Sequence, residues 1–270
     1  MLTLRKGRYI ARIAKSDADR EAALRLRALA FRGAGGRTDG GTGGVGSQTG
    51  GRTDGRTAGM AGDLDTDHFD AECVHVLVED QQDGALVCCF RLLHLGSGAE
   101  IGRSYSAQFY ELSALADFEG PMVEMGRFCI HPDRRDGDIL RIAWGAMTAY
   151  VDAEGVEMLF GCASFHGTEA RHYYDAFALL RDRHLAPKRW LPRVKAPSVF
   201  RFASRLRRKP DMKAAQAAMP PLLRTYLLMG GWVSDHAVID DDMGTLHVFT
   251  GLEIRAVPPA RARLLRGVAG

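Results

Sequence analysis

The chain has 270 residues and a formal net charge of +3; 46% of its residues are hydrophobic and 26% are charged, which is ordinary composition for a globular protein. No run of about 18 apolar residues occurs, and residues 1–16 lack the apolar core of a signal peptide, so we expect neither a transmembrane helix nor secretion. The five cysteines form no CxxC pair, which indicates reduced thiols and a cytoplasmic protein.

Glycine is concentrated in one segment, because 13 of the 31 glycines lie within residues 33–62. The hexapeptide Gly-Gly-Arg-Thr-Asp-Gly occurs there twice, at residues 35–40 and 50–55, without the Gly-X-Y period of collagen. Since the segment holds only two larger apolar side chains, it cannot form a hydrophobic core. We therefore expect a disordered, glycine-rich loop inserted at residues 33–62.

The remaining chain alternates between predicted strands and helices. Alternating or β-branched segments predict strands at residues 8–14, 74–80, 86–95, 122–130 and 156–164, and two more within 232–254. Helical periodicity predicts helices at residues 17–31, 138–154, 168–184 and 198–209, and one between Pro220-Pro221 and Gly230-Gly231. The strand–helix–strand unit from residue 122 to 164 implies a parallel pair with a right-handed crossover. This order predicts an α/β protein with a mixed central sheet, and it resembles the fold of GNAT N-acyltransferases.

A strongly basic segment follows. Residues 181–209 contain 11 Lys or Arg and a single acid, so the rest of the chain is net negative. Residues 198–209 place apolar side chains on one helical face and arginines on the other, which predicts a basic amphipathic helix. Such a surface suits an acidic protein or an anionic membrane, and the chain lacks the aromatic stacking motif typical of RNA binding. The alternative is a solvated helix without a partner. The candidate docking residues are Arg201, Arg205, Arg207 and Arg208.

Two charged residues, Glu124 and Arg127, lie in the strand predicted at 122–130, where burial is unfavourable unless the charges are paired or used. A regular strand would place Glu124, Gly126, Phe128 and Ile130 on one face and Arg127 on the other. A bulge at Gly126 would change this alternation and free a backbone N–H for a thioester carbonyl. Glu124 could then accept a proton from an attacking amine. The alternative is a salt bridge that only stabilises the strand.

The turn after this strand, Arg134-Arg-Asp-Gly137-Asp-Ile139, resembles the pyrophosphate loop of acetyl-CoA-using GNAT enzymes, Arg/Gln-x-x-Gly-x-Gly/Ala. Ile139 replaces the last small residue, which argues against a tight coenzyme A pyrophosphate cradle. An acyl carrier protein presents a single phosphodiester and requires less. The candidates for binding the acyl or pantetheine part of a donor are Gly126, Phe128, Cys129, Ile130, Arg134 and Gly137. For Cys129, a buried structural thiol is the favoured alternative.

Several multi-residue motifs recur in the order found in one family. They are Gly126-Arg-Phe-Cys-Ile-His-Pro-Asp-Arg-Arg, Phe160-Gly-Cys-Ala-Ser-Phe-His-Gly, Met219-Pro-Pro-Leu-Leu-Arg-Thr-Tyr-Leu and Gly244-Thr-Leu-His-Val-Phe. On these motifs the chain resembles the bacterial L-ornithine N-alpha-acyltransferases, which are related to the acyl-homoserine-lactone synthases. The resemblance runs through most of the chain and places the glycine-rich segment inside one domain. We therefore expect a GNAT-like domain over residues 1–254 and a C-terminal tail at 255–270.

The resemblance implies transfer of a 3-hydroxyacyl group from acyl carrier protein to the alpha-amine of L-ornithine, giving lyso-ornithine lipid without a cofactor. It implies Glu124 as the base, with Arg127 and Arg91 shaping the site. Asp67 and Asp70 are candidates for binding the cationic substrate, and their alternative is a role as loop and helix-capping acids. Because the product is a membrane lipid, peripheral contact with the anionic inner membrane is a further expectation.

Two other functions remain open at this point. One is an acyl-homoserine-lactone synthase that uses S-adenosylmethionine as the amine donor. The other is a non-enzymatic module that binds membrane or RNA through its basic segment, although this leaves Glu124 and Arg127 unexplained. His166 and His172 lack metal-ligand spacing with any cysteine, so we expect no metal site, and we expect no nucleic-acid partner.

Overall fold

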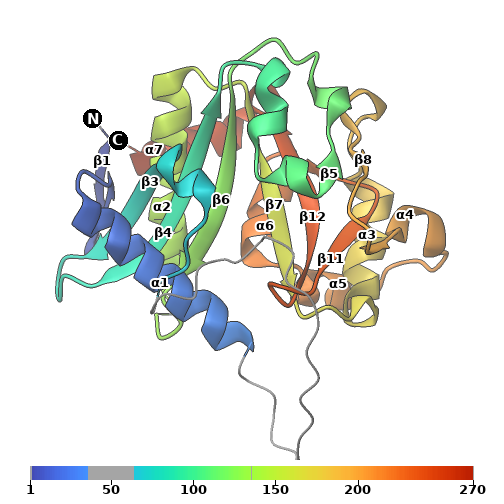
Figure 1. The fold of residues 1–270 in the computed structure, drawn as a ribbon, viewed down its shortest axis with the longest axis horizontal. Helices are drawn as coiled ribbons and strands as arrows, with labels where there is room; N and C mark the ends of the chain where they lie inside the picture. Colours follow the sequence, from blue (N-terminus) through green and yellow to red (C-terminus); the bar gives the residue numbers. More distant parts are fainter. Residues whose placement is uncertain (1, 36–63, 135, 270) are drawn as a thin grey trace, which may run out of the picture.

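The computed structural model describes residues 2–35, 64–134 and 136–269, so most of the glycine-rich segment predicted at 33–62 lies outside the described residues. Within the described chain, ten strands form one mixed sheet, and helices and short turns cover its two faces (Figure 1). The predicted α/β class, with a mixed central sheet flanked by helices, is confirmed.

The elements are as follows. The strands of the main sheet are β1 (Thr3–Lys6), β2 (Tyr9–Ile13), β3 (Val74–Asp80), β4 (Leu86–Leu95), β6 (Met122–Ile130), β7 (Met158–His166), β9 (Val199–Phe200), β10 (Trp232–Val233), β11 (Ala237–Asp240) and β12 (Thr245–Glu253). A separate two-stranded sheet consists of β5 (Tyr110–Glu111) and β8 (Arg193–Val194). The helices are α1 (Asp17–Gly35), α2 (Gly137–Glu154), α3 (Tyr174–Arg183), α4 (Phe202–Arg205), α5 (Met212–Ala218), α6 (Pro221–Leu228) and α7 (Pro259–Ala269). The 3₁₀ turns η1 (His68–Ala71) and η3 (Ser106–Gln108) contribute to the site.

The main sheet has the spatial order β1-β2-β3-β4-β6-β7-β12-β11-β9, and β10 pairs with β12. β6 and β7 run parallel and α2 connects them, which confirms the predicted strand–helix–strand unit. β3, β4 and β6 occupy the predicted residues. Gly155 ends α2 in the left-handed conformation expected of a helix-terminating glycine, with φ of 62°.

The two faces of the sheet pack against different helices. α2 covers one face of β2, β3, β4 and β6 and buries Ile139, Ala143 and Met147 there. α3 continues this layer over β7 and β12, where Phe177 is fully buried. α1 lies on the opposite face, and its Leu26 packs in a cluster with Cys89 of β4 (Figure 1). The middle of that opposite face, beside α1, is where the charged residues of β6 lie.

The amphipathic helix predicted at residues 198–209 is wrong. The segment instead forms β9, which pairs with β11, followed by the single turn of α4. The apolar side chains expected to face a membrane are used in the core, since Phe202 is 0% exposed and Leu206 is 8% exposed. Phe202 also stacks on Phe177 with ring centroids 5.1 Å apart. Tertiary burial therefore overrides the helical periodicity of this segment.

The C-terminal tail expected at residues 255–270 contains α7, which packs on α2. A Cβ atom at Gly145 of α2 would lie 2.7 Å from Val268 Cγ1 of α7 and 2.8 Å from Leu4 Cδ2 of β1. A larger residue at Gly145 would therefore force these side chains of β1 and α7 to shift from their close packing against α2 (Figure 1). None of the described helices combines the length and apolar character needed to cross a bilayer.

Candidate active site

The centre of the sheet opens between two parallel strands. β6 and β7 pair only from Met122–Met158 to Glu124–Phe160, although β6 continues to Ile130 and β7 to His166. Beyond the last pair the strands diverge. Gly161 lies at this point, and a Cβ atom there would be 2.4 Å from the carbonyl oxygen of Met125, so only glycine fits. The divergence exposes strand edges and side chains in the middle of a sheet whose strands are otherwise continuously paired.

A β-bulge reshapes the opened part of β6. Cys89 faces Cys129 and Arg91 faces Gly126, so Phe90 alone spans Arg127 and Phe128. Arg127 has a φ of 51°, a left-handed conformation that is uncommon for a residue other than glycine. The predicted bulge is thus present, but one residue later than Gly126.

The bulge also corrects the predicted alternation of side chains. Gly126 and Arg127 lie on the same face as Glu124, because Arg127 reaches Asp67, which Arg91 also binds from that face. Phe128 and Ile130 turn to the opposite face and pack against the α2 core. Phe128 stacks on Phe90 with ring centroids 5.7 Å apart. Glu124 and Arg127 are therefore brought together, whereas a regular strand would separate them.

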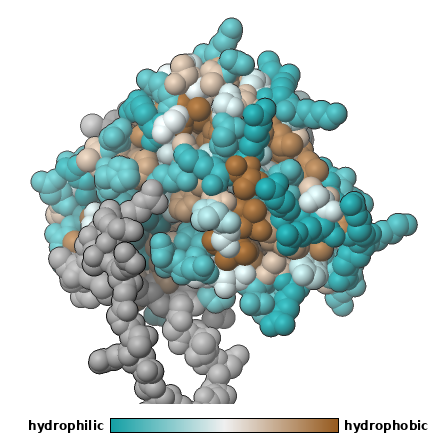
Figure 2. All heavy atoms as spheres, turned by 45° about the vertical axis from the view of Figure 1, so that its right-hand side comes forward, coloured by the Kyte–Doolittle hydropathy of each residue, from teal (hydrophilic) through white to brown (hydrophobic). Residues whose placement is uncertain are grey.

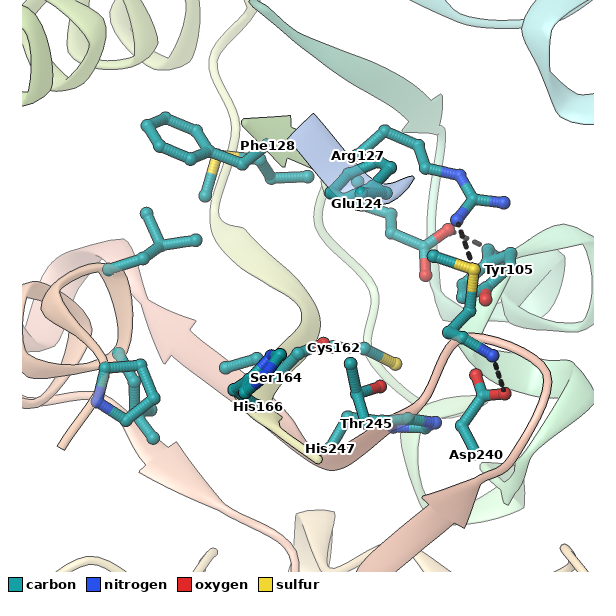
Figure 3. A pocket seen from close by; sticks show the side chains of 18 of the residues that line it. Tyr105, Glu124, Arg127, Phe128, Cys162, Ser164, His166, Asp240, Thr245 and His247 are labelled. Carbon is teal, nitrogen blue, oxygen red and sulfur yellow. Dashed lines mark hydrogen bonds between the residues drawn. The ribbon is translucent and has the colours of Figure 1, made fainter. Parts of the chain in front are cut away.

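A cavity of about 270 Å³ lies in this opening (Figure 3). It extends from the bulge of β6 across β7 to the turn between β11 and β12. Of the residues predicted for the site, Arg91, Glu124, Gly126, Arg127 and Phe128 line it. The sequence interpretation assigned no role to the other polar or sulfur-containing residues that line it, which are Tyr105, Met125, Cys162, Ser164, His166, Asp240, Met243, Thr245 and His247.

Glu124 is almost fully enclosed, with 4% of its surface exposed. Its Oε2 accepts the backbone N–H of Tyr105 at 2.7 Å, and its Oε1 accepts the N–H of Ser106 at 2.8 Å and the Ser106 hydroxyl at 2.5 Å. Burial raises the pKa of Glu124, and the donors from Ser106 and Tyr105 partly oppose that rise. A carboxylate has about four acceptor positions, so these three bonds leave room for one more donor, such as an amine.

Within the described residues, no Lys or Arg forms an ion pair with Glu124, so the alternative of a purely structural salt bridge is not what the structure contains. The three donors come from η3 and the residue before it, a segment for which the sequence predicted no element. The carboxylate is held in one orientation by backbone groups, while its environment disfavours the charge. This combination is typical of a residue that exchanges a proton.

Asp67 and Asp70 hold the arginines of the site in place and do not line the cavity. Asp67 Oδ2 accepts from Arg91 Nη2 at 2.9 Å and from Arg127 Nη2 at 3.1 Å. Asp70 Oδ1 accepts from Arg91 Nη1 at 2.7 Å and from Arg27 Nη1 at 2.6 Å. Both acids also form the capping box of η1. Of the two predicted roles, the structure shows the loop-ordering one, and contact of these acids with the cationic substrate stays a prediction.

Arg127 keeps donors for a ligand. Its Nη1 donates to the thioether sulfur of Met243 at 3.6 Å, and sulfur is a weak acceptor. Its Nε is buried without a hydrogen-bond partner among the described residues, since Asp65 Oδ2 is 3.6 Å away. A carboxylate is a stronger acceptor than a thioether, so an acidic group in the cavity would replace the contact with Met243.

The other predicted donor-binding residues lie away from the cavity. Cys129 is buried under α1 with its Sγ 3.5 Å from that of Cys89, which agrees with a structural thiol. Ile130 packs in the α2 core. Arg134 is paired with Asp83 at 2.5 Å on the surface.

Gly137 begins α2 at some distance from the cavity lining. The Asp136 side chain caps this helix by accepting the N–H of Asp138 at 2.9 Å, and Asp138 adds a second acid to the first turn. Two carboxylates compensate the positive end of the helix dipole, which disfavours a phosphate there. The start of α2 is therefore unfavourable for a pyrophosphate, which agrees with the presence of Ile139 where the pyrophosphate loop has a small residue.

The basic segment is partly used inside the protein. Arg181 Nη1 donates to the carbonyl of Leu206 at 2.5 Å, and Arg208 pairs with Asp175 at 2.8 Å. Arg201, Arg205 and Arg207 are exposed. α4 lies on the right-hand side of Figure 1, which comes forward in Figure 2, and Figure 2 shows a central apolar area there surrounded by hydrophilic side chains. The arginines therefore remain available as surface charges, but without the apolar face expected for membrane insertion.

A parallel strand pair that diverges where one of its strands is bulged, with a buried carboxylate at the divergence, is the arrangement of an N-acyltransferase of the GNAT type. The family profile described as an acetyltransferase (GNAT) domain matches residues 50–145. The chain is 35% identical over 199 residues to the L-ornithine N(alpha)-acyltransferase of Rhodobacter capsulatus, covering 72% of this chain and 76% of the relative. It belongs to the L-ornithine N(alpha)-acyltransferase family.

A second relative, the L-ornithine N(alpha)-acyltransferase of Brucella abortus, is 30% identical over 202 residues, covering 72% of this chain and 71% of the relative. Among solved structures, the fold is similar to that of BjaI, a CoA-dependent acyl-homoserine lactone synthase, with a TM-score of 0.47 and 12% identity over 94% of this chain and 83% of that chain. Family membership favours the ornithine acyltransferase prediction over the two alternatives. The described residues contain no cluster of three or more His, Cys, Asp or Glu that could hold a metal ion.

Proposed function

We propose that the protein transfers a 3-hydroxyacyl group from acyl carrier protein to the α-amine of L-ornithine, giving lyso-ornithine lipid. The observation that carries this proposal is the enclosed Glu124 carboxylate at the opening between β6 and β7, with one acceptor position free and Arg127 beside it. The names of the relatives, L-ornithine N(alpha)-acyltransferase, support L-ornithine as the acyl acceptor.

In the reaction, the α-amine attacks the thioester carbon, a C–N bond forms, and the C–S bond breaks. Ornithine enters with its α-amine protonated, so a base must remove a proton before or during attack. Glu124 takes that proton through its free acceptor position, and burial brings its pKa closer to the working pH. The attacking nitrogen loses a second proton as the amide forms, and this proton passes to the pantetheine thiolate that leaves. Glu124 returns the first proton to solvent, so the reaction releases one proton overall.

Arg127 orients the acceptor by binding its α-carboxylate. The guanidinium is fixed on one side by Asp67 at 3.1 Å, so its free donors point in a constant direction. Binding of the carboxylate beside Glu124 would place the α-amine next to the base, because the two groups share one carbon atom. Proximity of this kind contributes a large part of enzymatic rate enhancement.

The donor in this proposal is an acyl carrier protein rather than coenzyme A, and no cofactor takes part. The acid-capped start of α2 disfavours a pyrophosphate. The exposed Arg201, Arg205 and Arg207, with the partly paired Arg208, supply positive charge for an acidic carrier protein. The proposal implies a cytoplasmic enzyme that releases its lipid product at the inner membrane.

Incubation of the purified protein with 3-hydroxyacyl carrier protein and ornithine tests the proposal. We expect thiol release and an N-acylated ornithine in the mass spectrum. Parallel reactions replace ornithine with S-adenosylmethionine, or the carrier protein with the corresponding acyl-coenzyme A. Product with S-adenosylmethionine alone would support the lactone synthase instead, and no thiol release with either amine would exclude both.

A further inference from the structure

Asp240, the last residue of β11, is a buried acid in the wall of the cavity. Its side chain is 8% exposed, and its Oδ1 accepts the backbone N–H of Met243 at 3.0 Å. Among the residues that the structure describes, no Lys or Arg forms an ion pair with it, whereas Asp67 and Asp70 are both paired. A buried carboxylate without an ion pair is unfavourable. Burial raises the pKa of Asp240, and the N–H of Met243 and the more distant charge of Arg127 only partly oppose that rise.

The strand register places Asp240 beside two other polar side chains. Asp240 faces Thr245 across the β11–β12 pair, and Val238 faces His247. Since residues two apart on a strand share a face, Asp240, Thr245 and His247 lie on the same face of the sheet. All three line the cavity on the side away from the bulge, as Figure 3 shows.

His247 adds a second acceptor to this wall. The Tyr110 hydroxyl lies 2.8 Å from the His247 carbonyl oxygen and 3.1 Å from its Nδ1. A hydroxyl has one proton, so it donates to the carbonyl and accepts from Nδ1–H, which leaves Nε2 with a free lone pair. Nε2 has no hydrogen-bond partner in the described part of the chain. Burial lowers the pKa of His247 to about 4, so the ring is neutral at physiological pH.

The cavity therefore has opposite polarity at its two ends. Arg127 offers unused donors at the bulge, while Asp240 and His247 offer acceptors at the β11–β12 turn. Met243 connects the two ends, because its sulfur accepts from Arg127 and its N–H donates to Asp240 (Figure 3). An amino acid with a second amine on its side chain has the complementary arrangement, a carboxylate at one end and an ammonium at the other.

We propose that Asp240 binds the side-chain ammonium of the acceptor, with His247 as a second acceptor, and so selects basic amino acids and directs acylation to the α-amine. This inference rests on the proposed function, in which ornithine is the acceptor. An ammonium held at Asp240 stays protonated and cannot attack the thioester. The α-amine, held beside Glu124 by Arg127, is then the one amine that can lose its proton.

The test compares ornithine with norvaline, which has the same carbon chain and no terminal amine. Wild type should prefer ornithine strongly in kcat/KM. Asp240→Asn should lower kcat/KM for ornithine by at least about 30-fold, since a buried charge pair loses one partner. Its kcat/KM for norvaline should stay equal or rise. The matched control is Asp241→Asn, which removes the same charge from the exposed neighbour and should keep the wild-type preference.

A second variant, Asp240→Glu, distinguishes loss of the ammonium site from misfolding of Asp240→Asn. Asp240→Glu keeps the charge but moves the carboxylate outward by one methylene, so the preference should shift toward the shorter 2,4-diaminobutanoate. Damage to the fold cannot produce such a shift. Equal ornithine preference in wild type and Asp240→Asn, or no shift in Asp240→Glu, would overturn the inference while leaving the proposed function intact. A wild type that does not acylate ornithine would instead overturn the proposed function.

Discussion

Replacement of Glu124 by glutamine tests the proposed base most directly. Glutamine has nearly the same shape as glutamate, but its amide cannot accept a proton from an amine. Its oxygen can still accept the N–H and hydroxyl of Ser106. Its NH₂ group then faces the N–H of Tyr105, which at present donates to Glu124 at 2.7 Å. Glu124→Gln therefore removes the base. It also places the glutamine NH₂ group against the N–H of Tyr105, so that this N–H loses its acceptor.

The two losses have different magnitudes and appear in different measurements. One buried donor without a partner destabilises the fold by about 1–3 kcal/mol. Loss of a general base lowers kcat by roughly 10²–10⁴-fold, which corresponds to about 3–5 kcal/mol in the activation free energy. If Glu124 only held the Tyr105–Ser106 turn, the stability would fall while turnover by the folded fraction stayed close to that of wild type.

The assay follows thiol release from 3-hydroxyacyl carrier protein with a thiol-reactive chromophore, at saturating ornithine and over a range of pH. Urea unfolding of the same samples gives the free energy of unfolding. We expect a large fall in kcat and loss of the acidic limb of the pH profile. A folded Glu124→Gln protein with near-normal turnover and an unchanged profile would refute the assignment of Glu124 as the base.

Three further predictions follow from the same geometry. Ser106→Ala removes a donor that lowers the pKa of Glu124, so that pKa should rise and the acidic limb of the kcat profile should move to higher pH. Asp67→Asn should destabilise the protein by about 3 kcal/mol in urea unfolding, because it removes the charge that pairs with both Arg91 and Arg127 and leaves Arg91 with Asp70 alone. Burial raises the pKa of Asp67, but Arg91 and then Arg127 outweigh it and lower that pKa from 3.8 to about 2. Ionised Asp67 therefore contributes fully to the free energy of unfolding above pH 4, and this contribution is lost as the pH falls toward 2. Arg205→Glu combined with Arg207→Glu should raise KM for the carrier protein several-fold, most clearly at low salt.

The first and last of these predictions have matched controls within the chain. Ser104→Ala removes another buried hydroxyl of the same segment, which donates to the carbonyl of Ile101 and not to Glu124, so the pH profile should not move. Arg261→Glu reverses an exposed charge on α7 and should leave KM for the carrier protein unchanged. If Arg261→Glu raised KM for the carrier protein as much as the Arg205 and Arg207 changes do, the effect would come from the net charge of the protein and not from a docking surface.

Local patterns in the sequence determined much of the fold. Period-two segments coincide with β3, β4 and β6, and the apolar period of residues 138–154 coincides with α2, because residues a few positions apart share one face of an element. The parallel pairing of β6 and β7 followed from the helix between them. The four motifs together identified the family, and Glu124 lies two residues before the first of them.

The parts decided only by the tertiary structure depend on contacts distant in sequence. The bulge at Arg127–Phe128 comes from the register between β4 and β6, and it alone brings Arg127 to the face of Glu124. The donors to Glu124 come from a turn 18 and 19 residues away, with no regular pattern of its own. Asp240 joins the same cavity through the pairing of β11 and β12, and the arginine-rich segment around Phe202 follows the core and not its helical period. Burial and pairing with remote strands outweigh local propensity at these positions. The sequence therefore identified Glu124 and Arg127, whereas only the fold brought Ser106 and Asp240 to the site.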